Sequence, residues 1–415
     1  MIFTEYGCIG KKLPHSFSKI IHEKIGGYSY ELCELDEDEV DSFMKAHNFR
    51  AINVTIPYKQ TVIPYLDEIS NTAKAIGAVN TIVNKNGKLF GYNTDFYGMT
   101  ALIERNGISL KNKKVIILGS GGTSKTSLAV AEFLGAKEIL RVSRTAKEGG
   151  ITYSELYENH TDADVIINTT PVGMFPDIFA SPVDIEKFQN LSGVIDAVYN
   201  PLSTVLVSKA NKLGIPSDCG LYMLTAQAVK AYEIFTDSTA EKSLADRIFS
   251  EVLSEKKNIV LTGMPGSGKS TTGKILAEKL GREFIDTDEE IRKSSGIEIS
   301  DYFAKHGEKE FRKLETEVIK AISSKSGIVI ATGGGAVLKK ENIDALKMNG
   351  TVYFLDRKLC DLLPTPDRPL ASSAEAIKER YSERYGIYTS TADETIKVEG
   401  SCIDTAYELE RKHFK

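Results

Sequence analysis

Short apolar runs alternate along the chain with longer segments of helical periodicity. Four such runs are Val115–Leu118, Val165–Ile167, Ile259–Leu261 and Ile328–Ile330. Short strands that are apolar on both faces and alternate with helices are typical of parallel sheets covered by helices on each side. The pattern therefore predicts an α/β fold throughout the chain.

Two segments each join an apolar strand, a glycine-rich loop and a helix. The first, residues 115–134, is built around Gly119-Ser120-Gly121-Gly122, and the second, residues 259–280, around the loop 263–270. Glycines at such a point let a helix N-terminus approach a phosphate closely. Each segment therefore predicts the opening of a nucleotide-binding sheet. Only the second loop contains a lysine, which argues against simple duplication.

Length and charge pattern indicate where the chain divides. At roughly 150 residues per domain, 415 residues predict about three domains. Residues 254–258, Ser-Glu-Lys-Lys-Asn, lack any apolar side chain and follow a long helical stretch, residues 221–253. We place the main boundary there, and a softer one near Asn106-Gly107, before the first glycine loop.

Composition narrows the class of protein. Hydrophobic residues make up 41% and charged residues 26%, close to the globular average, and the formal net charge is −5. Without a basic surplus, neither nucleic acid nor an anionic membrane is expected as the main partner. The five cysteines form no C-x-x-C pair, no apolar run could span a membrane and no signal peptide is recognisable. We expect a cytoplasmic protein.

The second glycine loop fits G-x-x-x-x-G-K-[S/T] between a predicted strand and a predicted helix. Lys269 would reach the β- and γ-phosphates of ATP, and the Ser270 hydroxyl would hold Mg²⁺. Downstream, Asp286 and Asp288 stand two residues apart at a strand end, where both carboxylates face one side. One carboxylate can bind the water shell of the metal ion, and the other can accept a hydrogen bond from a hydroxyl of the phosphate acceptor. The alternative is that these acids only begin a helix.

Two further features of this half follow the acidic pair. Arg312 and Glu315 share a helix face at i, i+3, which alone is typical of an ordinary surface pair. Gly333-Gly334-Gly335 follows a predicted strand, at the end where open α/β sheets bind ligands. Together with the phosphate loop, these residues resemble shikimate kinase over about residues 257–415.

The resemblance to shikimate kinase implies a role for each matching residue. Shikimate would be held by Asp288, Arg312, Gly334 and Arg384. Mg²⁺ would be held by Ser270 and Asp286. ATP would be bound by Gly266, Ser267, Gly268, Lys269, Ser270, Thr271 and a lid arginine, Arg368.

The chain departs from the kinase family pattern around the lid. Residues 362–366, Leu-Leu-Pro-Thr-Pro, stand where the family has a helix and a further basic residue, and Ala371 replaces a leucine. The segment from Arg368 to Arg384 is also shortened. A weak kinase half beside an active dehydrogenase half is therefore one alternative reading.

The first glycine loop follows a strand and opens a helix, although Ser124 takes the place of the third glycine of G-x-G-x-x-G. The next strand ends at Ser143-Arg144-Thr145. An arginine between hydroxyls, where NAD-binding units carry an acid, favours the 2′-phosphate of NADP, and Lys147 is expected to assist. The alternative is an exposed arginine at a strand end.

Polar residues also end apolar runs near the N-terminus. Lys59, Asn80 and Asp95 stand in separate loops, which suits a polyhydroxylated acid, with Lys59 and Asp95 as a proton-transfer pair. Taken singly, each is more typical of an ordinary turn or surface. Their order, together with Asn168–Met174 (N-T-T-P-V-G-M), resembles shikimate dehydrogenase over about residues 1–253.

This second resemblance implies two sets of binding residues besides the catalytic pair Lys59 and Asp95. The substrate set is Ser16, Ser18, Thr55, Lys59, Asn80, Asp95, Tyr199 and Gln227. The NADP set is Gly119, Ser120, Gly121, Gly122, Thr123, Ser143, Arg144, Thr145, Lys147, Ala197 and Gly220. The implied lobes are a substrate lobe of 1–105 completed by 220–253, a Rossmann-like NADP lobe of 106–219, and the P-loop domain of 257–415.

The two resemblances imply consecutive reactions on small molecules. NADPH would reduce 3-dehydroshikimate to shikimate, and ATP with Mg²⁺ would phosphorylate shikimate to shikimate 3-phosphate. The competing class is a regulatory protein that senses shikimate or quinate with reduced turnover. The intact Lys59, Asp95, Lys269, Ser270 and Asp288 argue against it. An oligomer is compatible with the sequence, but no pattern in it indicates the number of subunits.

Overall fold

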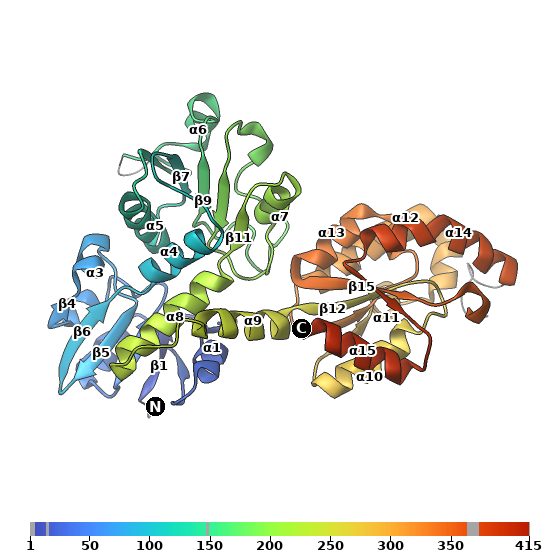
Figure 1. The fold of residues 1–415 in the computed structure, drawn as a ribbon, viewed down its shortest axis with the longest axis horizontal. Coiled ribbons are helices and arrows are strands. Elements are labelled where there is room, and N and C mark those ends of the chain that lie inside the picture. Colours follow the sequence, from blue (N-terminus) through green and yellow to red (C-terminus); the bar gives the residue numbers. More distant parts are fainter. Residues whose placement is uncertain (1–4, 14–15, 147–148, 363–372, 415) are drawn as a thin grey trace. The chain divides into compact units, whose positions relative to one another are not determined.

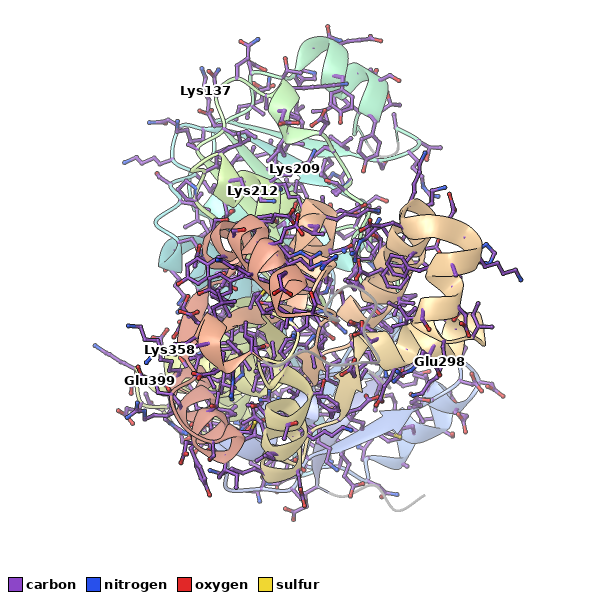
Figure 2. The ribbon with its side chains drawn as sticks, turned by 90° about the vertical axis from the view of Figure 1, so that its right-hand side faces the viewer. Lys137, Lys209, Lys212, Glu298, Lys358 and Glu399 are labelled. Carbon is purple, nitrogen blue, oxygen red and sulfur yellow. The ribbon has the colours of Figure 1, made fainter. Side chains whose placement is uncertain are left out.

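A computed structural model describes residues 5–13, 16–146, 149–362 and 373–414. The chain forms two compact units, Met1–Val252 and Leu253–Lys415 (Figure 1). Each unit is α/β. Charged side chains such as Lys137, Glu298 and Lys358 project from the surface (Figure 2).

The first unit begins with a mixed six-stranded sheet in the order β2-β1-β3-β5-β6-β4. Its strands are β1 (Tyr6–Gly10), β2 (Glu31–Glu34), β3 (Ala51–Val54), β4 (Glu68–Ile69), β5 (Thr81–Lys85) and β6 (Lys88–Tyr92). The helices around it are α1 (Ser18–Ile25), α2 (Glu39–Ala46), η1 (Ile63–Tyr65) and α3 (Asn71–Ile76).

One part of this sheet departs from the predicted parallel pattern. β5 runs antiparallel to both β3 and β6. β5 and β6 are joined by Asn86-Gly87, which have φ values of 54° and 87°. Two successive residues with positive φ are the mark of a tight hairpin turn, and Asn-Gly is the dipeptide that favours it most.

The rest of the first unit is built on a parallel five-stranded sheet in the order β11-β10-β9-β7-β8. Its strands are β7 (Lys114–Leu118), β8 (Glu138–Val142), β9 (Val165–Asn168), β10 (Gly193–Asp196) and β11 (Ser217–Cys219). The helices are α4 (Asp95–Arg105), α5 (Gly122–Phe133), α6 (Tyr153–Asn159), η2 (Ile185–Lys187), α7 (Val205–Lys212), α8 (Leu221–Thr236) and α9 (Leu244–Lys256).

The central strands of this sheet are buried on both faces, as their apolar runs predict. Val115 and Ile117 of β7 pack on the side of α4 and α8, in a cluster with Met99. Ile116 packs on the other side, in a cluster with Leu156 of α6. Alternate residues of one strand thus serve two separate cores.

Helix α8 returns to the first sheet after the parallel sheet is complete. It packs on α1, α4 and β5. Phe235 of α8 is buried with Tyr6 of β1 and with Tyr30, the residue before β2. The predicted helical stretch 221–253 forms two helices, because α8 ends before Asp237, whose φ is 52°. The predicted boundary patch 254–258 is the end of α9 and the start of the next strand.

The second unit has a parallel five-stranded sheet in the order β13-β14-β12-β15-β16. Its strands are β12 (Asn258–Thr262), β13 (Phe284–Asp286), β14 (Val329–Ala331), β15 (Gly350–Asp356) and β16 (Glu394–Lys397). The helices are α10 (Lys269–Leu280), α11 (Thr287–Ser295), α12 (Ile299–Ser323), η3 (Ala336–Leu338), α13 (Lys340–Asn349), η4 (Leu359–Asp361), α14 (Ala374–Thr391) and α15 (Cys402–His413).

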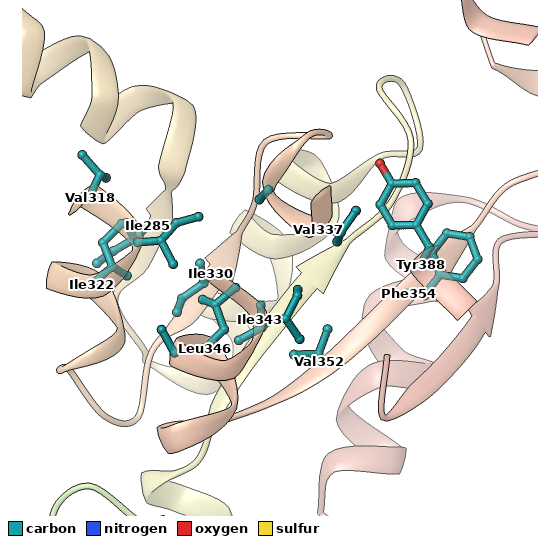
Figure 3. Close-up of a cluster of buried hydrophobic side chains, with 14 of the residues drawn as sticks. Ile285, Val318, Ile322, Ile330, Val337, Ile343, Leu346, Val352, Phe354 and Tyr388 are labelled. Atoms are coloured by element: carbon teal, nitrogen blue, oxygen red, sulfur yellow. The ribbon is translucent and has the colours of Figure 1, made fainter. Parts of the chain in front are cut away.

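This sheet also separates two cores. On one face, Ile330 and Val352 of the strands meet Ile322 of α12 and Leu346 of α13 (Figure 3). On the other face, Leu261 and its neighbours are covered by α10 and α15. All five strands run parallel, so their carboxyl ends share one edge. Within the described residues, no helix is long and apolar enough to cross a membrane.

Candidate active sites

The predicted pair Lys59 and Asp95 is formed. Lys59 lies in the loop after β3, and Asp95 is the first residue of α4. Lys59 Nζ lies 2.5 Å from Asp95 Oδ2, and the two side chains are 17% and 12% exposed. This partial shelter from water keeps the ion pair strong while leaving both groups open to a ligand.

A buried network connects the predicted Asn80 and Gln227. Asn80 Nδ2 donates to Gln227 Oε1 at 3.3 Å and to Thr94 Oγ1 at 3.1 Å. Thr94 Oγ1 also donates to Gln227 Oε1 at 3.0 Å. The network fixes Gln227 of α8 next to the turn that carries Asp95, so residues far apart in sequence share one site.

The predicted serines and Tyr199 meet at the same site. The Ser18 backbone N–H donates to Ser16 Oγ at 3.2 Å. Between them, the Phe17 ring packs on the ring of Tyr199 with centroids 5.2 Å apart. Burial raises the pKa of Tyr199, with a smaller contribution from the Cys8 thiol. Thr55, whose N–H donates to the Ile9 carbonyl at 3.0 Å, lies at the end of β3.

The Cys8 thiol is influenced by both Lys59 and Tyr30. Burial raises the pKa of Cys8 to about 12, while Lys59 and a hydrogen bond from Tyr30 oppose the rise. Because its pKa is so high, Cys8 stays in the neutral thiol form near pH 7. It therefore packs as a small apolar side chain. Cys8 is therefore close enough to Lys59 and to Tyr199 for their charges to influence one another.

The first glycine loop lies at the carboxyl end of β7. Gly121 is the N-cap of α5 and supplies no side-chain cap, so the first N–H groups of the helix are left for a ligand. Gly119 has a φ of 115°, and a side chain there would collide with Thr169 after β9. Ser124 Oγ donates to the Gly119 carbonyl at 2.8 Å and so braces the loop from within.

The end of β8 lies beside this loop, because β7 and β8 are paired along their length. The Gly119 N–H donates to the Val142 carbonyl at 2.8 Å. Ser143 Oγ donates to the Thr145 carbonyl at 2.6 Å, and Arg144 is exposed. Lys147 lies outside the described residues. The predicted NADP residues of the loop and of β8 are thus neighbours.

A buried carboxylate fixes the ends of β9 and β10. Asp196 accepts from Asn168 Nδ2 at 2.9 Å, from Thr204 Oγ1 at 2.8 Å and from the Val198 N–H at 3.0 Å. Burial raises the pKa of Asp196 to about 6, against the effect of these three donors. Ala197 follows it directly, and the Gly220 N–H donates to the Val198 carbonyl at 2.8 Å.

The second glycine loop lies at the carboxyl end of β12. Lys269 Nζ donates to the carbonyls of Gly263 and Met264, at 2.8 Å and 3.0 Å. These bonds fold the lysine over the loop, where it would meet a phosphate. Gly268, the N-cap of α10, has a φ of 93° and provides no side-chain cap. The first N–H groups of α10 are thus available to an anion.

The predicted metal pair is in contact. Ser270 Oγ donates to Asp286 Oδ2 at 2.6 Å. Asp286 also caps α11 by accepting from the Asp288 N–H at 2.9 Å, so the alternative reading of these acids as a helix start holds as well. A hydroxyl and a carboxylate are ligands that Mg²⁺ accepts. The described residues contain no cluster of three or more His, Cys, Asp or Glu side chains that could hold a metal without phosphates.

Arg312 and Glu315 form a buried ion pair, not the surface pair that their spacing alone suggests. Arg312 Nη1 lies 2.7 Å from Glu315 Oε2, with side chains 10% and 1% exposed. Burial raises the pKa of Glu315, while Arg312 lowers it. A side chain on Gly335 would collide with the Arg312 guanidinium, and one on Gly333 with Asp288. The glycines therefore admit these two charged groups to one site.

Arg384 reaches the same glycines from α14. Arg384 Nη1 donates to the Gly334 carbonyl at 3.1 Å, and Tyr388 Oη donates to the same oxygen at 2.5 Å. Arg384 is 6% exposed, yet its Nε has no acceptor among the described residues. A buried donor without a partner inside the protein points to an acceptor on a ligand. The lid arginine Arg368 lies outside the described residues.

Two family models match the chain. One, the substrate-binding domain of shikimate dehydrogenase, covers residues 8–82, and the other, shikimate kinase, covers residues 265–410. A shikimate dehydrogenase (NADP(+)) of Clostridium perfringens (strain SM101) is 38% identical over 265 residues, covering 60% of this chain and 97% of that protein. The chain belongs to the shikimate dehydrogenase family. Its C-terminal part is a shikimate kinase domain.

Further relatives and solved structures match the dehydrogenase part. The shikimate dehydrogenase (NADP(+)) of Methanococcus maripaludis (strain S2) is 40% identical over 256 residues, covering 55% of this chain and 91% of that protein. A chorismate mutase/shikimate 5-dehydrogenase fusion protein from Clostridium acetobutylicum has a TM-score of 0.57 at 36% identity, covering 61% of this chain and 98% of its own.

Several of the similar structures contain ligands. The shikimate 5-dehydrogenase from Thermus thermophilus, in complex with NADP(H) and shikimate, has a TM-score of 0.54 at 28% identity, covering 60% of this chain and 99% of its own. Two features of this chain suit ligands of the same chemistry. The uncapped start of α5 suits a pyrophosphate, and the sheltered Lys59 and Asp95 suit a hydroxylated ring.

Sequence reasoning missed several residues of both sites. In the dehydrogenase unit these are Cys8, Tyr30, Asn53 and Thr94, and in the kinase domain Tyr388. The Asn53 side chain accepts from Tyr30 Oη at 2.7 Å and donates to Thr81 Oγ1 at 3.1 Å. Asparagine in an otherwise apolar strand, as in Ala51–Val54, was the available signal, because buried amides need partners.

Proposed function

We propose that this shikimate dehydrogenase family member is a bifunctional enzyme that makes shikimate and then phosphorylates it. The first unit reduces 3-dehydroshikimate with NADPH, and the second transfers a phosphoryl group from ATP to shikimate, with Mg²⁺. The main support is that each unit combines a glycine loop at an uncapped helix start with a sheltered pair of charged side chains, Lys59 with Asp95 in the first and Arg312 with Glu315 in the second.

In the dehydrogenase unit, Lys59 and Asp95 handle the proton. NADPH, when bound, supplies the hydride to the ring ketone. The Lys59 ammonium can donate a hydrogen bond to the ketone oxygen and give or relay a proton as negative charge develops there. Asp95, 2.5 Å away, holds Lys59 in place and can take part in the same proton transfer. Asn80 and Gln227 position the substrate hydroxyls through the network with Thr94.

In the kinase domain, binding and charge stabilisation do most of the work. The Arg312 and Arg384 guanidinium groups suit the shikimate carboxylate, which a planar fork can bind through two parallel bonds. Asp288 lies beside Gly333, where it can accept a hydrogen bond from the attacking hydroxyl. Lys269 would leave the loop carbonyls to bind the transferred phosphate. Ser270 and Asp286 would hold the metal ion.

We also propose the lobe boundaries and the remaining site residues on the same basis. The substrate lobe comprises 1–105 and 220–253, which the packing of α8 on α1 and β5 supports. The NADP lobe comprises 106–219, and the kinase domain 257–415. Gly119 to Thr123, Ser143 to Thr145, Ala197 and Gly220 bind NADP, and Gly266 to Thr271 bind ATP.

One coupled assay tests the proposal. The purified chain is given 3-dehydroshikimate, NADPH, ATP and Mg²⁺, and we expect shikimate 3-phosphate. Omitting ATP should stop the reaction at shikimate, and omitting NADPH should stop it at the start. A chain that binds the substrates but turns over neither would instead be a sensing protein. Shikimate that accumulates in the presence of ATP would mean that the kinase domain is inactive.

A further inference from the structure

One arginine beside the phosphate loop has no role in the sites described so far. Arg357 directly follows β15, which pairs with the loop-bearing strand β12 along its length. It therefore lies at the carboxyl edge of the sheet, where the phosphate loop also lies. A side-chain carbon placed on Gly268 would lie 3.8 Å from Arg357 Nη2. The guanidinium thus borders the last glycine before Lys269.

The Arg357 side chain is half-buried, and its hydrogen bonds are incomplete. Its Nε is shielded from solvent and has no acceptor within the described part of the chain. The preceding carboxylate, Asp356, accepts a hydrogen bond from Tyr385 Oη at 3.2 Å. A shielded guanidinium N–H without an acceptor costs free energy, and a bound anion would remove that cost.

The surroundings of Arg357 favour a phosphate as that anion. The other atoms nearest the same point beside Gly268 are Cys402 Sγ and Thr272 Oγ1, which carry no formal charge in the thiol and hydroxyl forms. The uncapped start of α10 points its N–H groups and its positive helix end into the loop. An arginine placed there adds a planar set of donors that matches phosphate oxygens.

We propose that Arg357 is a nucleotide-binding residue, whose guanidinium donates hydrogen bonds to the phosphates of ATP held by the loop Gly263 to Ser270. The proposal rests on the proposed kinase function, and it adds a second positively charged residue, besides Lys269, to the nucleotide site. Lys269 belongs to the loop itself, whereas Arg357 approaches from the next strand of the sheet. Two cations on separate elements would then hold the polyphosphate.

The test measures the affinity of the full chain for ADP by calorimetry. Arg357→Ala and Arg357→Gln should each weaken ADP binding about tenfold or more, because a hydrogen bond between charged groups is lost. Inorganic tripolyphosphate should lose affinity to a similar extent, and Arg357→Lys should recover part of it. In turnover, the KM for ATP should rise while the KM for shikimate stays unchanged.

Lys358→Ala is the matched control. It removes the same charge from the next residue, which is exposed (Figure 2), and should leave ADP affinity unchanged. Dehydrogenase turnover and the melting curve of each variant check that it is folded. Unchanged ADP affinity in both neutral Arg357 variants would overturn the proposal. So would an equal loss in Lys358→Ala, or a loss for ADP without one for tripolyphosphate.

The same experiment separates this proposal from the proposed function. ADP binding is measured without shikimate and without turnover. If the wild-type chain binds ADP but forms no shikimate 3-phosphate, the kinase proposal fails. The comparison of ADP affinities still decides whether Arg357 contacts the nucleotide.

Discussion

The two glycine loops solve the same problem with different sources of positive charge. Both α5 and α10 begin at a glycine, Gly121 and Gly268, without a side-chain cap. The loop before α10 leads into its own cation, Lys269, which is 5% exposed. The loop before α5 carries none. Its nearest predicted cation, Arg144, stands after the neighbouring strand β8.

The difference reflects what each loop has to do. A hydride donor needs its phosphates only as an anchor, so backbone N–H groups and one peripheral arginine suffice. Phosphoryl transfer develops charge on the phosphate itself, so a cation within the loop is required. Variants that remove these charges should therefore affect turnover in the kinase domain and cofactor affinity in the dehydrogenase unit.

The largest expected effect lies at the ion pair of the dehydrogenase site. Lys59→Ala should lower the turnover of 3-dehydroshikimate on the order of 10²- to 10⁴-fold, because the proton donor is lost. NADPH binding should survive, since Lys59 is remote from the glycine loop in sequence and role. Steady-state kinetics and NADPH fluorescence measure the two effects.

The control for this variant is Lys45→Ala, which breaks an exposed lysine–aspartate pair with 2.9 Å between Lys45 Nζ and Asp41 Oδ2 in the same unit. It should leave turnover unchanged. Near-wild-type turnover of Lys59→Ala would contradict the assignment of the catalytic pair.

The next effect belongs to the cation of the second loop. Lys269→Ala should lower kinase turnover on the order of 10²- to 10³-fold, as expected for the loss of one group that stabilises developing charge. Dehydrogenase turnover of the same chain should stay unchanged, which makes it an internal control. Lys274→Ala, on the exposed side of the same helix, should affect neither activity.

A smaller effect is expected for the cation of the first loop. Arg144→Ala should raise the KM for NADPH about tenfold, because a bond between charged groups is lost, and leave the KM for NADH nearly unchanged. Lys137→Ala, at the opposite end of β8, is the control. An equal rise for both cofactors would show that Arg144 does not read the 2′-phosphate.

The smallest effect concerns stability and a buried histidine behind the dehydrogenase site. His22 is fully buried and stacks on Tyr30 with ring centroids 4.0 Å apart. Burial lowers its pKa from 6.5 to about 3. The unfolded chain therefore takes up a proton below pH 6.5 that the folded chain refuses, so stability falls as the pH falls from about 6.5 toward 3.

His22 should account for about 1 kcal/mol of stability lost between about pH 7 and about pH 5.5. Urea unfolding followed by dehydrogenase activity measures this loss. His22→Gln should remove that part of the pH dependence, and His306→Gln, at an exposed histidine, should not. A direct check is the NMR titration of His22, which should stay neutral down to about pH 4.

The α/β fold and the positions of both glycine loops could be predicted from the sequence, because both depend on local patterns. A fully apolar strand followed by glycines and a helix defines a phosphate loop within about 20 residues. The antiparallel hairpin of β5 and β6 was also visible, as Asn86-Gly87, but its signal is only two residues long. The prediction of parallel strands, which rests on the apolar runs, takes no account of it.

The rest depended on contacts between distant segments. Arg312 and Glu315 look like a surface pair on a helix, and only the packing of α12 against the glycines after β14 shows that they are buried. No sequence pattern distinguishes Tyr388 from the other tyrosines. Only the folded structure shows that it donates a hydrogen bond to the Gly334 carbonyl. Spacing along a helix predicts which residues share a face, but not what covers that face.

The return of α8 to the first sheet has a consequence for synthesis on the ribosome. Tyr6 and Tyr30 are made early, but Phe235, which is buried against them, emerges some two hundred residues later. Until α8 has been synthesised, the apolar side chains of the N-terminal segment that pack against it remain exposed to solvent. A fragment that stops before Leu221 should therefore aggregate or recruit chaperones, and a dehydrogenase unit expressed by itself must include the whole of α8.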